Sequence, residues 1–414
     1  MSRIHVSGMA LLLSFILVGL LILVCVLVGD IGIWFGLGVL GLYTSLVGIA
    51  IFGRPSVREA LPVLIALKRA ERAFVRGDFA TMESLCGRAI AQSEACGRYR
   101  DFLTGAALVE LGYLYHIQGR WADCEPIFLR AVSHFDVAGR EGSPSNTVAS
   151  RSAMIGRLNL ASPYINQGRF AEAEPVYREI DASTKKDSTL GPLYSALGVY
   201  NRGQMLGVLG RLEEAEVLTR RAMTMLGRPH GRGKQVSAFF MAGLADICQL
   251  QVRLDEAVTL ARAAVEAGNN SVFGARHAVQ TPILNALAEV LRARGIFDEA
   301  ERTCLRSQTL TEKAFGPDHF WLDGCLGTLA RIRVAHGRHA EAANLLLQCL
   351  SILEKAVVPT HAKRLDRRAE YAKVLHLLGR HQEAIQWEPP AAEVPVLEKA
   401  DGGYTARIPE PPRR

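Results

Sequence analysis

The sequence has few aromatic residues and no cluster of charge of one sign. Aromatic residues make up 7% of its 414 residues, and a formal net charge of +7 is spread along the chain without a run of Lys or Arg. Proteins that bind nucleic acid usually gather basic residues on one face or interleave them with aromatic residues. Nucleic acid is therefore not expected as a partner.

Signatures of catalysis and metal binding are missing as well. The chain has no P-loop, no Ser-His-Asp pattern and no paired-carboxylate pattern, and none of its eight cysteines forms a C-x-x-C spacing. His336 and His339 are only two candidate ligands, fewer than a zinc site needs. We therefore expect no enzyme activity, no metal, no cofactor and no small-molecule substrate.

The scattered cysteines indicate free, buried thiols in a reducing compartment. Cys124, Cys304 and Cys349 occupy positions of the repeat that take a compact apolar side chain. We therefore predict that these three pack rather than react.

Apolar residues, in contrast, are abundant at 49% of the chain. Two uncharged stretches, at about 9–28 and 31–52, are separated only by Gly29 and Asp30. Each has about 20 residues, enough at 1.5 Å per residue to cross a hydrocarbon core of about 30 Å. Residues 1–55 are therefore predicted to form a membrane anchor of two transmembrane helices.

The charges around these stretches predict the orientation of the anchor. Arg3 precedes the first stretch and Arg54 and Arg58 follow the second, whereas the turn holds only Asp30. Positive flanks favour the cytoplasmic side, so the N-terminus and the following domain are expected in the cytoplasm, at the cell inner membrane. Two alternatives remain: a cleaved signal peptide, whose apolar core is normally shorter, and one continuous or re-entrant segment, which would place the domain on the other side.

From about residue 61 to residue 387 the chain repeats one phrase. A small residue is followed by Gly-Arg or a similar pair, an apolar residue, two mostly polar residues and Ala, as in GRFAEAE at Gly168. The copies begin at Gly77, Gly119, Gly168, Gly210, Val252, Gly295, Gly337 and Gly379. Their spacings of 42, 49, 42, 42, 43, 42 and 42 residues indicate one supersecondary unit stacked many times.

Each unit reads as two antiparallel helices joined at the glycine. Glycine takes a positive φ at such a turn, and small residues on the facing surfaces let the two helices approach. In the second copy, the pattern is carried by Leu111, Gly112, Tyr115, Gly119, Trp121, Cys124, Phe128 and Ala131.

These residues resemble the signature of the tetratricopeptide repeat (TPR), with Cys124 in place of an Ala. The period of 42 residues, and EKAFGPDH at 312–319, are similar to the kinesin light chain subgroup, although no kinesin motor partner is implied. The resemblance implies an all-α superhelical solenoid of seven to eight helix pairs over residues 56–388, preceded by the two transmembrane helices. It also implies an interaction scaffold whose partner is a protein.

Three features depart from the pattern. Val252 replaces the turn glycine, the link from Ala138 to Asn146 is longer than the others, and residues 389–414 are Pro-rich and charged. We expect the link to be a surface loop and the tail to be disordered.

The resemblance also suggests which residues contact a partner. The first helix of each TPR unit lines a concave groove, and Asn159 and Asn201 fall where the family often has an Asn that binds a peptide backbone. Tyr200, Arg157, Arg292 and Arg331 are less favoured candidates. The alternative for all six residues is a solvated helix face.

The leading functional hypothesis is a TPR scaffold or adaptor tethered at the cytoplasmic face of a membrane. One alternative is a structural or assembly subunit that oligomerises through a hairpin bearing Gly32 and Gly36. Another is a regulator of a membrane enzyme, with the catalysis in the partner.

Overall fold

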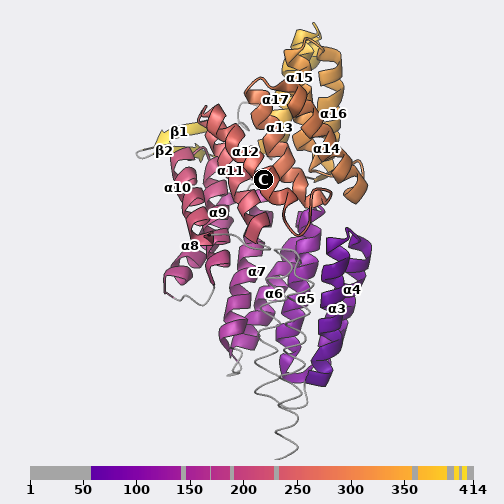
Figure 1. Cartoon of the computed structure of the whole chain (residues 1–414), viewed down its shortest axis with the longest axis vertical. Coiled ribbons are helices and arrows are strands. Elements are labelled where there is room, and N and C mark those ends of the chain that lie inside the picture. Colours follow the sequence, from indigo (N-terminus) through magenta and orange to yellow (C-terminus); the bar gives the residue numbers. More distant parts are fainter. Residues whose placement is uncertain are drawn as a thin grey trace, which may run out of the picture.

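Eight helix pairs are stacked in sequence order in the part of the chain that the computed structural model describes (Figure 1). That part comprises residues 57–140, 146–167, 169–186, 191–227, 233–356, 362–388, 396–400 and 403–407. Each pair forms one unit. The first helices of units 1 to 8 are α3 (Val57–Val75), α5 (Arg100–Ile117), α7 (Asn146–Asn166), α9 (Gly191–Val208), α11 (Gly233–Leu250), α13 (Thr281–Ala293), α15 (Leu322–Ala335) and α17 (Ala362–Leu377). The second helices are α4 (Phe79–Ser93), α6 (Trp121–Arg140), α8 (Phe170–Lys186), α10 (Leu212–Leu226), α12 (Leu254–Asn269), α14 (Phe297–Phe315), α16 (His339–Ala356) and α18 (His381–Trp387).

The turn between the two helices of a unit has the predicted backbone conformation. Gly119 has a φ of +74°, its N–H donates to the carbonyl of His116 at 3.0 Å, and the N–H of Arg120 donates to the carbonyl of Tyr115 at 2.9 Å. These two bonds satisfy carbonyls at the end of the first helix in the Schellman pattern. The repeated glycine is therefore confirmed as a left-handed helix cap at Gly119. Val252 takes the same conformation with a φ of +64°.

Small residues hold the two helices of a unit close together. A Cβ on Gly112 of α5 would lie 2.6 Å from the ring of Phe128 of α6, and a Cβ on Gly105 would lie 2.8 Å from the ring of Phe135. Both rings are buried. Glycine at these two positions of the first helix therefore makes room for an aromatic ring of the second helix in the same unit.

The stack coils until its later units meet its first two. The link 270–280, which includes a short 3-10 helix η3 (Ala278–Gln280), and the link 316–321 pack against the turns of units 1 and 2. Figure 1 shows α3 to α7 in the lower half and α13 to α17 above them. We call this contact the clasp; its residues are Phe273, His277, Phe315, His319, Phe320 and Trp321 on the later units and Phe74, Phe79, Ile117 and Gly119 on the first two.

The clasp combines ring packing with two hydrogen bonds to backbone carbonyls. Phe315 stacks on Phe79 with ring centroids 4.7 Å apart. His277 Nε2 lies 3.2 Å from the carbonyl oxygen of Phe74, and His319 Nε2 lies 2.8 Å from that of Ile117. The coil therefore joins residues that lie about half of the chain apart.

The expected membrane anchor requires a correction. The two predicted spans, at 9–28 and 31–52, lie outside the described residues. Among the helices that the structure does describe, none is both long enough and apolar enough to cross a bilayer. The prediction of an inner-membrane protein with two spans is contradicted and withdrawn, and the alternative of assembly through a transmembrane hairpin goes with it.

The tail, which we expected to be disordered, contains a two-stranded hairpin. β1 (Val396–Ala400) pairs antiparallel with β2 (Gly403–Arg407), and Ala400 is opposite Gly403. Asp401 and Gly402 are the residues between the strands, and Asp-Gly is a favoured sequence for a two-residue hairpin loop. The prediction of disorder was based on the composition of the tail and did not take this local hairpin sequence into account.

Candidate partner-binding groove

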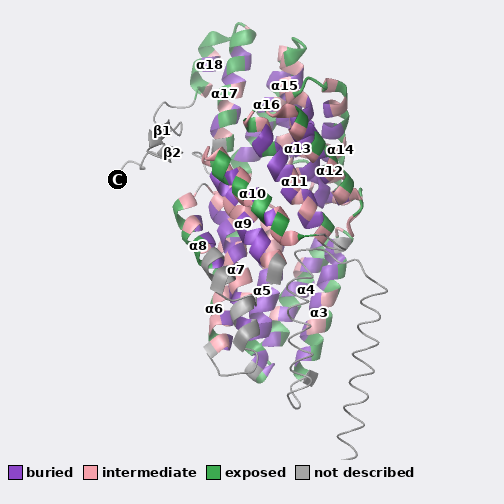
Figure 2. Cartoon of the chain, turned by 60° about the vertical axis from the view of Figure 1, so that its left-hand side comes forward, coloured by how far each residue is buried: buried purple, intermediate pink, exposed green. Residues whose placement is uncertain are grey.

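The first helices of neighbouring units contact one another, as α11 contacts α13 and α13 contacts α15, so that they line the inner face of the coil. Figure 2 shows buried residues concentrated between the helices and exposed residues on their outer faces. This inner face is the candidate groove. The six predicted contact residues all lie on first helices.

Asn159 and Asn201 lie at matching places on the adjacent helices α7 and α9. Each stands nine residues before its turn glycine, and each side chain is half-buried. Neither side-chain amide is hydrogen-bonded to another described residue. The two amides thus keep their donors and acceptors available on the inner face of units 3 and 4.

Arg157 and Tyr200 are instead held by neighbouring helices. The guanidinium of Arg157 donates to both carboxylate oxygens of Asp136 at 3.0 Å. The hydroxyl of Tyr200 donates to the carbonyl of Phe239 at 2.9 Å, and its ring stacks on Phe240 at 4.4 Å. Burial raises the pKa of Tyr200 above its usual value. These contacts assign both residues to packing between elements.

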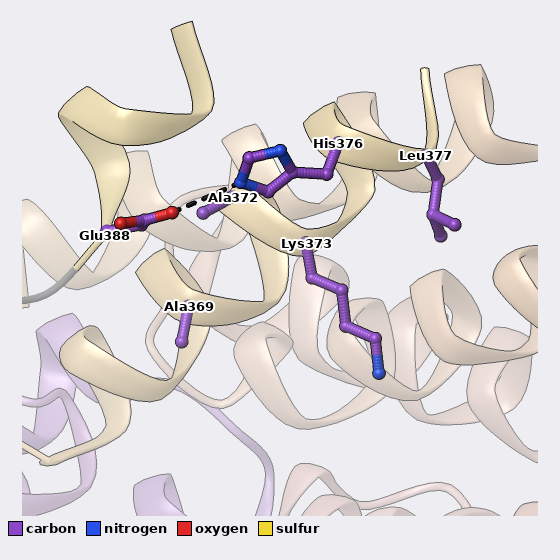
Figure 3. A pocket seen from close by; sticks show the side chains of 6 residues that line it. All are labelled: Ala369, Ala372, Lys373, His376, Leu377 and Glu388. Carbon is purple, nitrogen blue, oxygen red and sulfur yellow. Dashed lines mark hydrogen bonds and ion pairs between the residues drawn. The ribbon is translucent and has the colours of Figure 1, made fainter. Parts of the chain in front are cut away.

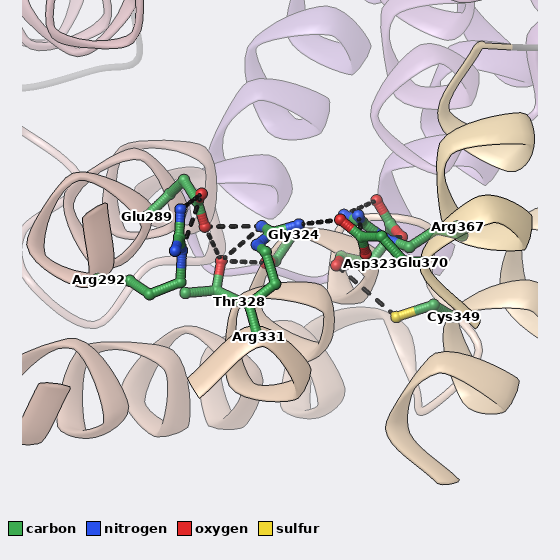
Figure 4. Close-up of polar contacts among 9 residues, drawn as sticks. All are labelled: Glu289, Arg292, Asp323, Gly324, Thr328, Arg331, Cys349, Arg367 and Glu370. Atoms are coloured by element: carbon green, nitrogen blue, oxygen red, sulfur yellow. Dashed lines mark hydrogen bonds and ion pairs between the residues drawn. The ribbon is translucent and has the colours of Figure 1, made fainter. Parts of the chain in front are cut away.

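Arg292 and Arg331 belong to a charge network across units 6 to 8 (Figure 4). Glu289 of α13 accepts from Arg292 at 2.7 Å and from Arg331 of α15 at 2.6 Å. Arg331 also donates to Glu370 of α17 at 2.7 Å. Burial opposes ionisation of Glu289, but the two arginines outweigh it and lower its pKa. Both arginines are therefore neutralised within the chain.

A buried ion pair extends this network. Arg367 of α17 donates to Asp323 of α15 at 2.7 and 3.3 Å, and the two residues are 9% and 2% exposed. A Cβ on Gly327 would lie 2.5 Å from the guanidinium, so glycine at this position makes the room that Arg367 occupies. The pair joins units 7 and 8, and sequence reasoning missed it because its two residues lie in different units.

Asp246 is a groove residue that the sequence did not single out. It lies on α11 with an exposed side chain, near Glu289 and Lys363. Enclosure by the surrounding helices and the charge of Glu289 raise its pKa above the usual value, whereas Lys363 lowers it. Because water reaches the exposed carboxylate, the burial effect is screened. The signal that would have found Asp246 is its place in the repeat, six residues before the turn, which it shares with Glu289 and Arg331.

The end of the solenoid carries a shallow pocket. Figure 3 shows it between α17 and the end of α18, lined by Ala369, Ala372, Lys373, His376, Leu377 and Glu388, with a volume of about 390 Å³. His376 Nε2 lies 3.2 Å from a carboxylate oxygen of Glu388. With only one such pair and an open shape, this pocket is a weaker candidate site than the groove.

The cysteines of the described ranges are buried among apolar side chains. The seven described cysteines are free and buried, as predicted, and burial raises the pKa of Cys124 to about 12; Cys25 lies outside the described residues. Across the described ranges, no three His, Cys, Asp or Glu side chains lie close enough to hold a metal ion.

Part of the chain matches the model of a repeat family. Residues 280–355, in units 6 and 7, match the tetratricopeptide repeat model. No curated protein sequence matches the chain. Taken with the helix pairs, the matched segment shows an all-α helical solenoid of the TPR type, as the sequence predicted.

Three solved structures illustrate the proteins to which this chain is similar. A putative kinesin light chain from Podosopora anserina is 23% identical and covers 47% of this chain and 90% of its own, with a TM-score of 0.36. BtubC (BKLC) from P. vanneervenii is 15% identical over 53% of this chain and 86% of its own, with a TM-score of 0.40. The apo form of the quorum sensor NprR from B. thuringiensis is 12% identical over 83% and 90%, with a TM-score of 0.47.

Proposed function

We propose that this chain is a protein-interaction scaffold that binds an extended segment of a partner protein against α7 and α9, with no catalytic step of its own. The observation that carries the proposal is a contrast within the groove. Asn159 and Asn201 have side-chain amides without a hydrogen-bond partner among the described residues, whereas Arg292 and Arg331 are paired inside the chain.

Amide side chains suit the backbone of an extended peptide, because each one both donates and accepts a hydrogen bond. The charged network of units 6 to 8 is a less favourable binding site. To bind a partner, its arginines would first have to break their ion pairs within the chain, and the free energy lost would offset the free energy gained from the new pairs. Units 3 and 4 are therefore the favoured binding segment. The partner is a protein segment whose backbone is accessible.

The test selects peptides from a random displayed library against the full chain and then measures their affinity for the double variant Asn159→Ala/Asn201→Ala. We expect affinity to fall about 10-fold or more, because two hydrogen bonds of about 1 kcal/mol each are lost. The unfolding midpoint should stay unchanged, since neither side-chain amide is hydrogen-bonded to another residue that the structure describes.

The matched control is Asn344→Ala, an exposed Asn on the outer helix α16, which should leave affinity unchanged. Selected peptides that bind the double variant and the wild type equally well would remove the groove of units 3 and 4 from the proposal.

A further inference from the structure

Asp246 is a carboxylate of the groove that has no ion pair. It lies on α11, the first helix of unit 5, and its side chain is exposed. No hydrogen bond or salt bridge joins it to another residue that the structure describes. The charges that act on it from a distance are the carboxylate of Glu289 and, in the opposite sense, the ammonium group of Lys363 on α17.

The later units show how a carboxylate at this place in the repeat is neutralised. We call the residue six positions before each turn residue the rung; the rungs of units 5, 6 and 7 are Asp246, Glu289 and Arg331. The rung Glu289 accepts from the rung of the next unit, Arg331, at 2.6 Å (Figure 4). Arg331 in turn donates to Glu370 of unit 8 at 2.7 Å. Charges of opposite sign therefore alternate along the inner face from unit 6 to unit 8.

This alternation is broken between units 5 and 6. The rung after Asp246 is Glu289, which carries the same charge, and the rung before it is the neutral Gln204. Both carboxylate oxygens of Glu289 already accept hydrogen bonds, one from Arg292 and the other from Arg331 and Thr328. Neither neighbouring rung can therefore supply a cation to Asp246.

The electrostatic surroundings of Asp246 favour an added positive charge. Enclosure by the surrounding helices and then the like charge of Glu289 raise the pKa of Asp246, although Lys363 lowers it. The ionised carboxylate is thus less stable here than it would be in water. A cation placed beside it would stabilise the ionised form.

Asp246 also continues the surface that we propose for units 3 and 4. Burial and, after it, the charge of Asp246 raise the pKa of Tyr200, which precedes Asn201 on α9. Asp246 therefore lies within electrostatic range of the helix that carries Asn201. The helices α7, α9 and α11 contact one another in sequence. Because packed helices lie about 8 to 10 Å apart and an extended chain advances about 3.3 Å per residue, a bound segment passes from one helix to the next in about three residues.

We propose that Asp246 binds a lysine or arginine side chain of the partner segment, about three residues from the position that Asn201 holds. This inference rests on the proposed function of the groove and adds the chemistry that selects the segment. The cation of the partner stands beside Asp246 as Arg331 stands beside Glu289, and it restores the alternation of charge along the inner face. The partner segment is therefore basic at this position.

The chain's own tail fits this description poorly. Its basic residues are Lys399, Arg407, Arg413 and Arg414. Lys399 and Arg407 belong to the paired strands β1 and β2. Three of the four residues before Arg413 are proline, which has no backbone N–H for an asparagine oxygen to accept from. A segment of another protein is therefore the occupant that both the amides and the carboxylate favour.

The experiment selects peptides from one random displayed library against three full-length chains, the wild type, Asp246→Asn and Asp246→Lys. We expect the wild type to enrich Lys or Arg at one position of the peptide. Asp246→Asn should enrich no charge there, and Asp246→Lys should enrich Asp or Glu. A purely structural role of Asp246 would weaken binding but would not reverse the charge that is selected.

The affinities of single peptides measure the size of the effect. Replacing the enriched basic residue by Gln should weaken binding to the wild type about 10-fold, because a hydrogen bond between charged groups is lost. The same replacement should leave binding to Asp246→Asn unchanged, and a peptide with Glu at this position should recover most of the affinity for Asp246→Lys. The matched control is Glu266→Gln, an exposed carboxylate on the outer helix α12, which should select the same basic peptides as the wild type.

The outcomes separate this inference from the proposed function. Peptides that depend on Asn159 and Asn201 but show no basic preference would overturn the role of Asp246 and leave the groove in place. Basic peptides that bind the wild type and Asp246→Asn equally well would overturn it too. Peptides that depend on neither asparagine would overturn the proposed function and this inference together.

Two further measurements identify other occupants of the groove. If the full-length variant Arg413→Ala/Arg414→Ala binds the selected peptides at least 5-fold more tightly than the wild type, the tail is the occupant and the proposal fails. A dimer in sedimentation that Asp246→Asn dissociates would make a second copy the occupant. We expect the variant of the tail to bind like the wild type and sedimentation to be the same for the wild type and Asp246→Asn.

Discussion

His319 lies against the carbonyl oxygen of Ile117, with its Nε2 2.8 Å from that oxygen, although the two residues are 202 positions apart. Its Nδ1 faces the N–H of Trp321 at 3.3 Å. A carbonyl only accepts and an N–H only donates, so the ring is neutral with its proton on Nε2. His277 repeats this arrangement between the carbonyl of Phe74 and the N–H of Val279. Two neutral histidines thus close the coil.

Acid should therefore weaken the clasp. Burial lowers the pKa of His319 to about 4, against the opposing effect of its bond to Ile117, and burial also lowers the pKa of His277. An unfolded histidine binds its proton near pH 6.5, so the contribution to stability is complete above that pH and is lost as the pH falls toward 4. For His319 alone the loss reaches about 3 kcal/mol. Urea unfolding at pH 7.5, 5.5 and 4.5 measures it.

The control for this pH dependence is His319→Gln, which cannot gain a proton in this range. The variant should be less stable than the wild type at pH 7.5 but lose less stability on going to pH 4.5. Equal losses in both proteins would show that His319 does not carry the acid effect.

Two turn glycines with the same backbone angle can separate clasp packing from backbone strain. Gly119 and Gly337 have φ of +74° and +72°, but a Cβ would meet the ring of Phe320 at Gly119 and open space at Gly337. Gly337→Ala should cost about 1 kcal/mol of unfolding free energy, from the backbone alone. Gly119→Ala should cost about 1 to 3 kcal/mol more, because the ring must move. Thermal unfolding of both variants gives the difference, and equal losses would mean that Phe320 yields freely.

Structural features that recur in every repeat unit could be predicted from the sequence, whereas contacts that occur only once in the chain could not. The turn glycines and the helix pairing recur every 42 residues or nearly so, so that each could be inferred from its copies. The clasp depends on how far the stack coils, which no single unit encodes. His319 lies in the link motif EKAFGPDH, but no local sequence pattern predicts that it contacts Ile117.

The candidate arginines show the same limit. Arg331 looks like a free groove cation in sequence, yet its partners Glu289 and Glu370 stand 42 and 39 residues away, one unit before and one unit after it. The helical period places all three on inner faces, but which rotamers meet across helices is decided by packing. The prediction for Asn159 and Asn201 required only a position in the repeat, and their contact with a partner stays a prediction.

The buried pair between Asp323 and Arg367 should be sensitive to the loss of one partner. Arg367→Ala leaves the carboxylate of Asp323 buried without its counter-ion, which costs about 3 to 5 kcal/mol. Arg338→Ala removes an exposed pair with Glu341 and should change stability by no more than about 1 kcal/mol. Replacing both buried partners, as Asp323→Leu/Arg367→Met, should recover most of the loss. Chemical denaturation of the four proteins tests this, and a double variant as unstable as Arg367→Ala would show that packing rather than charge sets the cost.

Val252 and Val217 offer a pair of substitutions whose effects should have opposite signs. Val252→Gly relieves a β-branched residue at a φ of +64°, so we expect unfolding free energy to rise by about 1 kcal/mol. Val217→Gly, at a 65% exposed position inside α10, should lower it by a similar amount, because glycine is a poor helix former. Thermal denaturation of both variants beside the wild type measures the two shifts. A decrease for Val252→Gly would mean that the side chain of Val252 packs within the chain and outweighs the backbone strain.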